Sequence, residues 1–252
     1  MNEPYSSIST PFSLEQLLLR EDVWVGHSRR FNTGVAVDTG YDALNSELLN
    51  GGWPAGSLIE VCQPGMQAEW QLFMPALQEV QGLIVVLNPP AMPFAQAFIQ
   101  AGINLDRLII VEAPDKSQFI ACFTELVRAS IGAVLAWQPQ DAPGYTELRK
   151  CQLAAAEGQG LCVMFRPSGA QQQSSPAVLR LYAKAVAAGL ELTLFKQKGY
   201  LQLRQPRPIL LALPEQWQAV LPYHALNERS ENSEGKETGR PLAQVLPLRS
   251  NQ

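Results

Sequence analysis

The middle of the chain alternates between short apolar runs and longer segments with apolar residues at helical spacing. Apolar runs without polar alternation occupy residues 57–62, 83–87, 108–111, 133–137 and 161–165. Segments with helical spacing occupy residues 67–80, 93–101, 116–130 and 144–157. Apolar strands that are each followed by a helix are typical of a parallel sheet that is buried on both faces. The alternation therefore predicts an α/β fold with a mostly parallel sheet flanked by helices.

The spacing of apolar residues changes after Pro176. Residues 178–186, 190–196 and 200–204 are predicted to be antiparallel strands, and glycines at the intervening positions fit tight turns. Residues 209–213 form a further apolar stretch. We therefore expect C-terminal β-hairpins beside the parallel sheet.

The two ends of the chain differ from this middle part. Residues 1–38 are predicted to be a tail with a short helix and an extended piece, Val23-Trp24-Val25, whose aromatic side chain needs a partner surface. Residues 39–213 form the predicted core, beginning with a helix over 40–49 and a turn over 50–56. Residues 214–252 form an extension, which is expected to be largely disordered from about residue 227 because it then becomes charged and poor in apolar residues. A small apolar island around Val245 and Leu246 either docks on the core or is a linear motif for a partner.

Composition excludes several classes of function. The formal net charge is −4, so no overall field attracts the chain to nucleic acid, and DNA binding is expected to be weak or indirect. Only two histidines are present, which disfavours histidine-based catalysis and most metal sites. The four cysteines have no metal-ligand spacing and indicate buried free thiols in a reducing compartment. The N-terminus resembles no signal peptide and prolines interrupt the uncharged stretch at 80–105, so a cytoplasmic protein is expected.

The turn after the first apolar run occupies the position of a phosphate loop. A phosphate loop uses glycine backbone N–H groups to surround phosphate, a lysine to contact the terminal phosphates and a hydroxyl to hold Mg²⁺. The corresponding residues here are Gln63, Pro64, Gly65, Ala68, Glu69 and Trp70, with Glu69 at the lysine position and Trp70 at the hydroxyl position. A carboxylate repels a triphosphate, and an indole does not coordinate magnesium. The sequence therefore predicts a degenerate loop with no nucleotide cofactor and no ATP hydrolysis. The alternative is weak binding of a phosphate or a peptide carboxylate, because a helix N-terminus favours an anion.

Several segments resemble the core of RecA-type recombinases. They are residues 40–44, the Gly-Gly-Trp-Pro-Ala-Gly turn at 51–56, the strand 58–61, residues 101–108 and residues 179–183. The order and spacing of further motifs, at 17–24, 51–54, 132–137 and 158–167, resemble more closely the ImuA/SulA family of RecA-like proteins. The resemblance runs from about residue 17 to 213 and implies a RecA-like core of the P-loop-NTPase type.

The catalytic positions of RecA are changed together in this chain. The catalytic glutamate falls near Pro90, the Walker B aspartate at Trp137 and the nucleotide-sensing glutamine at Pro167. Residues 168–176, which replace the second DNA loop of RecA, contain no positive charge. The resemblance thus implies a pseudo-ATPase without a catalytic residue or a metal.

The resemblance to ImuA implies an accessory role in the error-prone bypass of DNA lesions during the SOS response. The implied partners are an ImuB-like inactive polymerase, a DnaE-like error-prone polymerase and RecA itself. The alternative, implied by the resemblance to SulA, is a division inhibitor that binds FtsZ. SulA proteins are shorter and lack the complete Gly-Gly-Trp-Pro turn, which favours the first interpretation.

Candidate partner contacts are spread along the chain. They are Leu17, Leu18, Trp24, Arg166, Val245 and Leu246. Arg166 follows an apolar run at the edge of the sheet where open α/β folds bind ligands, and the alternative for it is a structural ion pair. Trp137, which ends a buried strand, is predicted to be a core residue.

Overall fold

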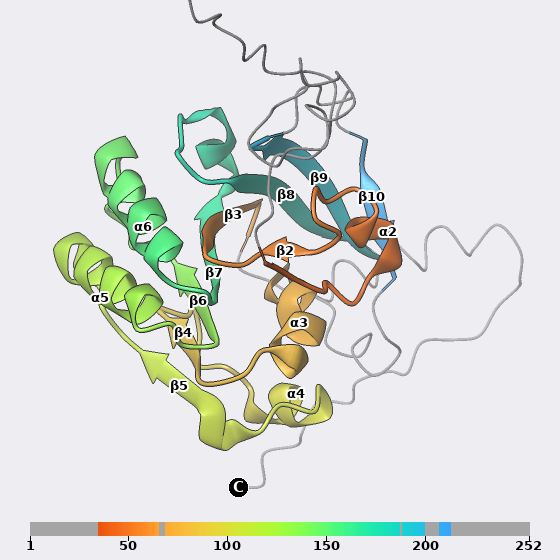
Figure 1. Ribbon diagram of the computed structural model, residues 1–252, viewed down its shortest axis with the longest axis horizontal. Helices are drawn as coiled ribbons and strands as arrows, with labels where there is room; N and C mark the ends of the chain where they lie inside the picture. The colour runs from red at the N-terminus through yellow and green to blue at the C-terminus, as the bar shows by residue number, and fades with distance from the viewer. Residues whose placement is uncertain (1–34, 66–68, 187, 200–206, 213–252) are drawn as a thin grey trace, which may run out of the picture.

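A computed structural model describes residues 35–65, 69–186, 188–199 and 207–212. Within these residues the chain forms one eight-stranded sheet with helices on both faces (Figure 1). From one edge to the other, the strands are β10 (Ile209–Leu211), β9 (Gly189–Gln197), β8 (Leu179–Val186), β3 (Ser57–Gln63), β7 (Leu161–Pro167), β6 (Ala133–Trp137), β4 (Ile84–Leu87) and β5 (Leu108–Val111). The predicted mixed α/β class with a mostly parallel sheet is confirmed.

The strands from β8 to β5 are all parallel to one another, and β9 is antiparallel to both of its neighbours. Strand β3 lies between β7 and β8, with Ile59 opposite Val163 on one side and Leu179 on the other. The carboxyl ends of β3, β4, β6, β7 and β8 therefore meet at one edge, which we call the carboxyl edge. The predicted strand at 200–204 lies outside the described residues.

Each face of the sheet has its own apolar core. One face packs against α5 (Lys116–Arg128) and α6 (Tyr145–Glu157), which also pack against each other. The opposite face is covered by α2 (Asp42–Asn45), η1 (Glu69–Phe73), α3 (Met74–Glu79), α4 (Ala95–Gln100) and η2 (Leu105–Arg107). Successive strand residues alternate between the two cores, so both faces must be apolar, as the unbroken apolar runs predict.

The predicted helix at 67–80 is wrong as a single element. Its described part divides into the 3-10 helix η1 and the α-helix α3, which begins at Met74. Pro75 has no N–H to donate to the carbonyl four residues earlier, but it is tolerated in the first turn of a new helix. The break therefore follows from the proline.

The predicted helix at 40–49 is also too long, because α2 ends at Asn45. The Asn45 side chain accepts a hydrogen bond from the N–H of Thr39, and the Ser46 hydroxyl donates to the carbonyl of Ala43. Such local side-chain bonds compete with helix propagation. The turn at 50–56 contains β2 (Trp53–Pro54), which pairs with β1 (Ala36–Val37) in a small second sheet.

Gly160 occupies a position where the backbone of the loop before β7 passes close to the loop before β6. A methyl group at Gly160 would collide with the carbonyl oxygen of Ile131, whereas a methyl group at the exposed Gly169 would meet no atom. Backbone cannot move aside as a flexible side chain does.

We expect Gly160→Ala to lower the free energy of unfolding by about 1–3 kcal/mol, as overpacked cores do. Urea denaturation measures this loss. Gly169→Ala is the matched control and is expected to cause no loss; equal effects of the two substitutions would contradict the predicted collision.

Candidate functional site

The degenerate phosphate loop begins where β3 ends, in the interior of the sheet. Gln63 is buried, Pro64 is exposed and Gly65 is half-buried. Residues 66–68, including Ala68, and the side chain of Glu69 lie outside the described residues. The absence of ATP hydrolysis at this turn therefore remains a prediction from the sequence, based on Glu69 at the lysine position and Trp70 at the hydroxyl position.

Trp70 follows this turn and packs onto the core. Its ring is half-buried and stacks on Phe98 of α4, with 5.2 Å between the ring centroids and 26° between the planes. The residue at the hydroxyl position thus contributes an apolar surface at the carboxyl edge.

An apolar pocket of about 200 Å³ lies beside Trp70, at the carboxyl ends of β4 and β6. Its lining consists of residues 89–94 together with Trp70, Val86, Phe98, Leu135 and Trp137. None of these lining side chains carries a charge or a hydroxyl group, so the described lining supplies no acid, base or nucleophile. The pocket suits an apolar or aromatic group, and its volume exceeds the roughly 150 Å³ of an apolar cavity that holds benzene.

Asn88 fixes the loop that forms one wall of this pocket. It adopts a left-handed backbone conformation, with φ 52°, at the end of β4. Its side-chain amide donates to the carbonyl of Ala113 at 2.7 Å, and the N–H of Ala113 donates back to the side-chain oxygen at 2.5 Å. Asparagine tolerates this conformation better than most residues, and the reciprocal bond ties the loop to the end of the neighbouring strand β5.

Trp137 lies at the base of the pocket, and its predicted role as a core residue is confirmed. It is 7% exposed and stacks on Phe165 with 4.4 Å between centroids. The Trp137 ring also lines the apolar pocket.

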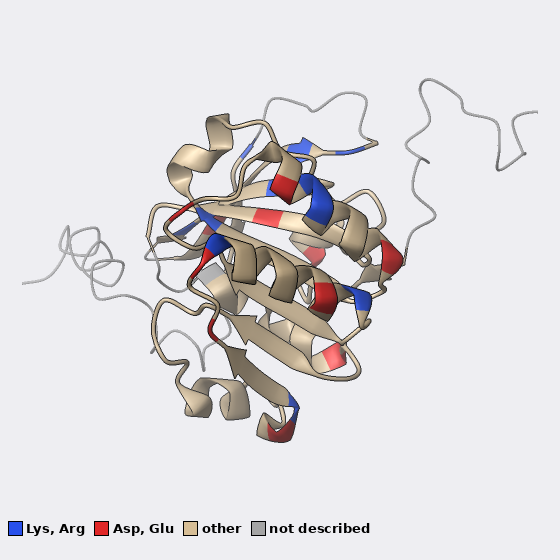
Figure 2. Ribbon diagram, turned by 90° about the vertical axis from the view of Figure 1, so that its left-hand side faces the viewer, with Lys and Arg blue, Asp and Glu red and all other residues tan. Residues whose placement is uncertain are grey.

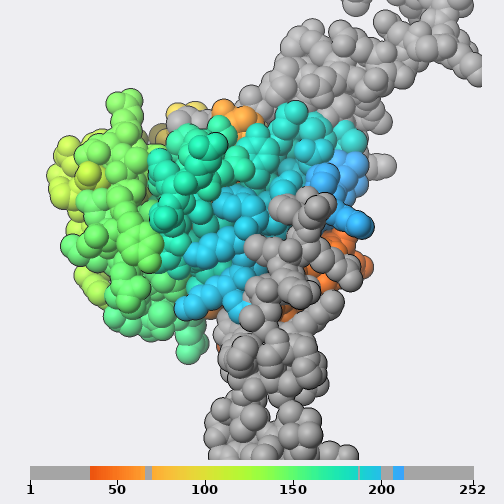
Figure 3. Space-filling view, turned by 90° about the horizontal axis from the view of Figure 1, so that it is seen from above, coloured from red at the N-terminus to blue at the C-terminus, as the bar shows by residue number. Residues whose placement is uncertain are grey.

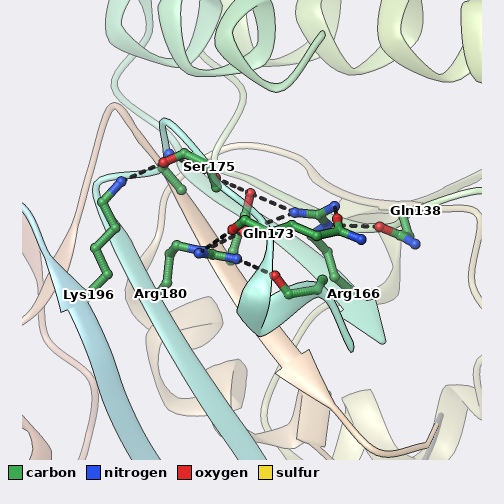
Figure 4. A network of polar contacts seen from close by, with 9 residues as sticks. Gln138, Arg166, Gln173, Ser175, Arg180 and Lys196 are labelled. Atoms are coloured by element: carbon green, nitrogen blue, oxygen red, sulfur yellow. Dashed lines mark hydrogen bonds and ion pairs between the residues drawn. The ribbon is translucent and has the colours of Figure 1, made fainter. Parts of the chain in front are cut away.

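A buried charge cluster lies beside the middle of β3, between the carboxyl end of β7 and the start of β8. The fully buried Glu60 carboxylate accepts a hydrogen bond from Arg180 Nε at 2.8 Å and from Arg166 Nη1 at 3.3 Å. The hydroxyl of Ser175 donates to it at 2.5 Å. Figure 4 shows Arg166 of β7 and Arg180 of β8, the two strands that flank β3, both close to Gln173. We call Glu60, Arg166 and Arg180 the charge cluster.

Further contacts hold the two arginines in place. Arg166 Nε donates to Gln138 Oε1 at 2.8 Å, and Arg166 Nη2 donates to Gln173 Oε1 at 2.9 Å. Arg180 also lies over the ring of Phe195, 4.9 Å from its centroid. A buried charge is tolerated only when it is paired and hydrogen bonded in this way.

Of the two alternatives for Arg166, a ligand contact and a structural ion pair, the structure shows the ion pair. The Arg166 side chain is fully buried and does not form an exposed contact surface. The sequence analysis missed Glu60 and Arg180, although a carboxylate inside the apolar run 57–62 was a usable signal. The other proposed contacts, Leu17, Leu18, Trp24, Val245 and Leu246, lie outside the described residues.

The buried surroundings of the charge cluster also shift the pKa of two neighbouring groups, Lys196 and Cys62. Burial, followed by the Arg180 charge, lowers the pKa of Lys196, whose amine donates to the carbonyl of Ser175 at 2.6 Å. Burial, reinforced by the Glu60 charge, raises the pKa of the Cys62 thiol to about 11. Burial disfavours the charged form in both cases.

No protein-family model matches this chain, and no curated protein matches it significantly. Among the described residues, no group of three or more histidine, cysteine or acidic side chains is arranged to hold a metal. None of the helices in the described ranges has the length and apolar character needed to cross a membrane.

We expect Glu60→Gln to lower the free energy of unfolding by about 3 kcal/mol or more, because it leaves two buried guanidinium groups without a counter-charge. Glu157→Gln is the matched control, since it breaks the exposed 2.9 Å pair with Arg128. Exposed pairs contribute less than about 1 kcal/mol. Similar denaturation midpoints for the two variants would contradict a central role for Glu60.

We also expect the cysteines to differ in their reactivity toward iodoacetamide near pH 8. Burial raises the pKa of Cys151 and of Cys162 to about 12 and blocks access to their thiols, as at Cys62. Cys122 is half-buried and should be alkylated first. Mass spectrometry of native and urea-unfolded protein checks the order; early modification of Cys162 in native protein would contradict it.

Proposed function

We propose that this chain is a non-catalytic, RecA-like accessory protein that supports translesion DNA synthesis through contacts with other proteins. The proposed partners are an ImuB-like inactive polymerase, a DnaE-like error-prone polymerase and RecA. The observation that carries the proposal is the apolar pocket at the carboxyl edge, where an α/β enzyme of this kind holds its catalytic groups. A lining of indole, phenyl and proline rings favours binding of an apolar group over chemistry.

The surface next to the pocket supports a role in protein contacts. Exposed apolar side chains lie on the pocket loop, on α4 and on the edge strand β5, and we call them the apolar edge: Met92, Phe94, Ile99, Ile109 and Ile110. In Figure 1, α4 and β5 lie at the same end of the molecule, and Figure 2 shows both elements without charged residues, although charged residues flank β5. Exposed apolar surface of this kind is typical of a protein interaction site.

Strand β5 adds a second feature to this surface. Among the described residues it pairs only with β4, so its other side is open to a further strand. Its sequence, Leu-Ile-Ile-Val, has neither the lysine nor the proline with which exposed edges avoid pairing. An extended segment of a partner, or the Val23-Trp24-Val25 segment of another copy, fits this edge.

The RecA-like assignment within the α/β class is part of the proposal. It is supported by the position of β3, which precedes the degenerate loop and lies inside a parallel sheet, and by the antiparallel strand β9 at the C-terminal side. The order of the motifs along the chain supports it independently.

The proposal predicts that the apolar edge is needed to recover partners. Tagged full-length protein from DNA-damaged bacteria should retain translesion polymerase subunits or RecA, identified by mass spectrometry. Ile110→Lys places a charge on the edge strand and should lower their recovery about tenfold. Leu153→Lys is the matched control, because Leu153 is 52% exposed on α6, which packs on the opposite face of the sheet.

Other outcomes of this experiment would contradict specific parts of the proposal. Equal recovery with Ile110→Lys would exclude the apolar edge as the contact, and unchanged self-association and partner binding of Trp24→Ala would exclude the N-terminal segment. Recovery of FtsZ without polymerases would replace the adaptor function by division inhibition. Micromolar binding of ATP would contradict the interpretation of the degenerate loop.

A further inference from the structure

Residues 168–176, which we call the strap, cross the face of the sheet over β3, from the carboxyl end of β7 to the start of β8. The strap contains the short 3-10 helix η3 (Ser168–Gln172) and lies between Pro167 and Ala177. In Figure 3 the teal part of the surface, which includes η3, lies between the green helices and the blue strands. Most strap side chains are exposed, and Ala170 is its one fully buried apolar residue.

The strap is held almost entirely by charged side chains of the sheet. Arg180 donates to the carbonyl of Ala170 at 2.7 Å and to the carbonyl of Gln173 at 3.0 Å. Arg166 donates to the Gln173 side chain, and Lys196 donates to the carbonyl of Ser175. The Ser175 hydroxyl completes the set by donating to Glu60.

The strands on both sides of the strap do not depend on it. Strand β7 is paired along its length with β3 and β6, and β8 is paired with β3 and β9. These ladders and the two apolar cores remain intact if the strap leaves the sheet. Opening of the strap therefore replaces hydrogen bonds within the protein by hydrogen bonds to water, and it exposes little apolar surface. A segment with these properties opens at a lower free-energy cost than unfolding of the whole protein.

We propose that the strap is a gate that opens as a unit over the charge cluster, with Glu60 as the group that keeps it closed. Glu60 orients both arginines, and the arginines in turn hold the strap carbonyls and Gln173. In the closed state Arg166 is inaccessible to any partner. In the open state two arginines and Lys196 face solvent beside a single carboxylate, so this face of the sheet gains a surface of net positive charge.

The inference is independent of the proposed accessory function, because it rests on contacts within the chain. It assigns a regulatory role to a segment that the sequence analysis treated only as a shortened loop. It also gives Arg166 a conditional role: a structural ion-pair partner in the closed state and a potential contact only after opening.

Amide hydrogen exchange of the full-length protein, resolved to single residues by fragmentation, tests the gate. The amide of Gln173 donates to the carbonyl of Ala170, and the amide of Ala177 donates to the Ser175 hydroxyl, so both report the closed strap. The amides of Val61 and Val163, in the paired strands β3 and β7, report global unfolding. We expect the first two amides to exchange at least about a hundredfold faster than the second two.

Gln173→Ala removes an acceptor from Arg166 and should accelerate exchange at residues 173 and 177 about tenfold, with no change at Val61 and Val163. Gln172→Ala is the matched control, since the neighbouring Gln172 side chain is exposed and makes no hydrogen bond with the described residues. Ser175→Ala, read at residue 173, should act like Gln173→Ala because it removes the bond to Glu60.

Two results would overturn the gate. Exchange at residues 173 and 177 that is as slow as at Val61 and Val163 would show that the strap opens only when the protein unfolds. Equal exchange in Gln173→Ala, Ser175→Ala and Gln172→Ala would show that the charge cluster does not hold the strap closed.

Discussion

A single buried carboxylate organises the most polar part of this protein. Glu60 lies in a strand that is covered on both faces, and it accepts hydrogen bonds from β7, from β8 and from the segment that joins them. A lone carboxylate at that position would be strongly destabilising, as would either arginine without it. The three charges are therefore tolerated only together, and the closed position of residues 168–176 follows from their arrangement.

Two chemically different regions lie on the sheet. At the carboxyl ends of β4 and β6 is an apolar pocket, and the reciprocal bond between Asn88 and Ala113 ties down the loop on one side of it. Over the middle of β3, between the end of β7 and the start of β8, is a closed network of charged and amide groups. Neither region presents a free acid, base or nucleophile among its described residues.

Local sequence predicted the strands better than the helices. The strand at 133–137 has the bounds that its apolar run predicts, because burial on both faces leaves no polar position inside it. The strand at 108–111 also has the predicted bounds, although it is an edge strand with Ile109 and Ile110 exposed. The helix predictions failed at Pro75 and at Asn45, where a missing donor or a side-chain hydrogen bond ends the helical ladder. Arg166 was identified as a candidate from its place at the end of a strand, but its partner was not. Glu60 is separated from Arg166 by 106 positions and from Arg180 by 120, beyond the reach of any local pattern.

The sequence by itself determined the α/β class, through apolar runs that only a sheet buried on both faces can accommodate. It also places Glu69 and Trp70 directly after the turn that follows the first of these runs. Tertiary structure decided which charges meet and which rings surround the pocket. The physical reason is that burial makes an unpaired charge intolerable, so each charged residue is fixed by partners that only the order of the strands brings beside it.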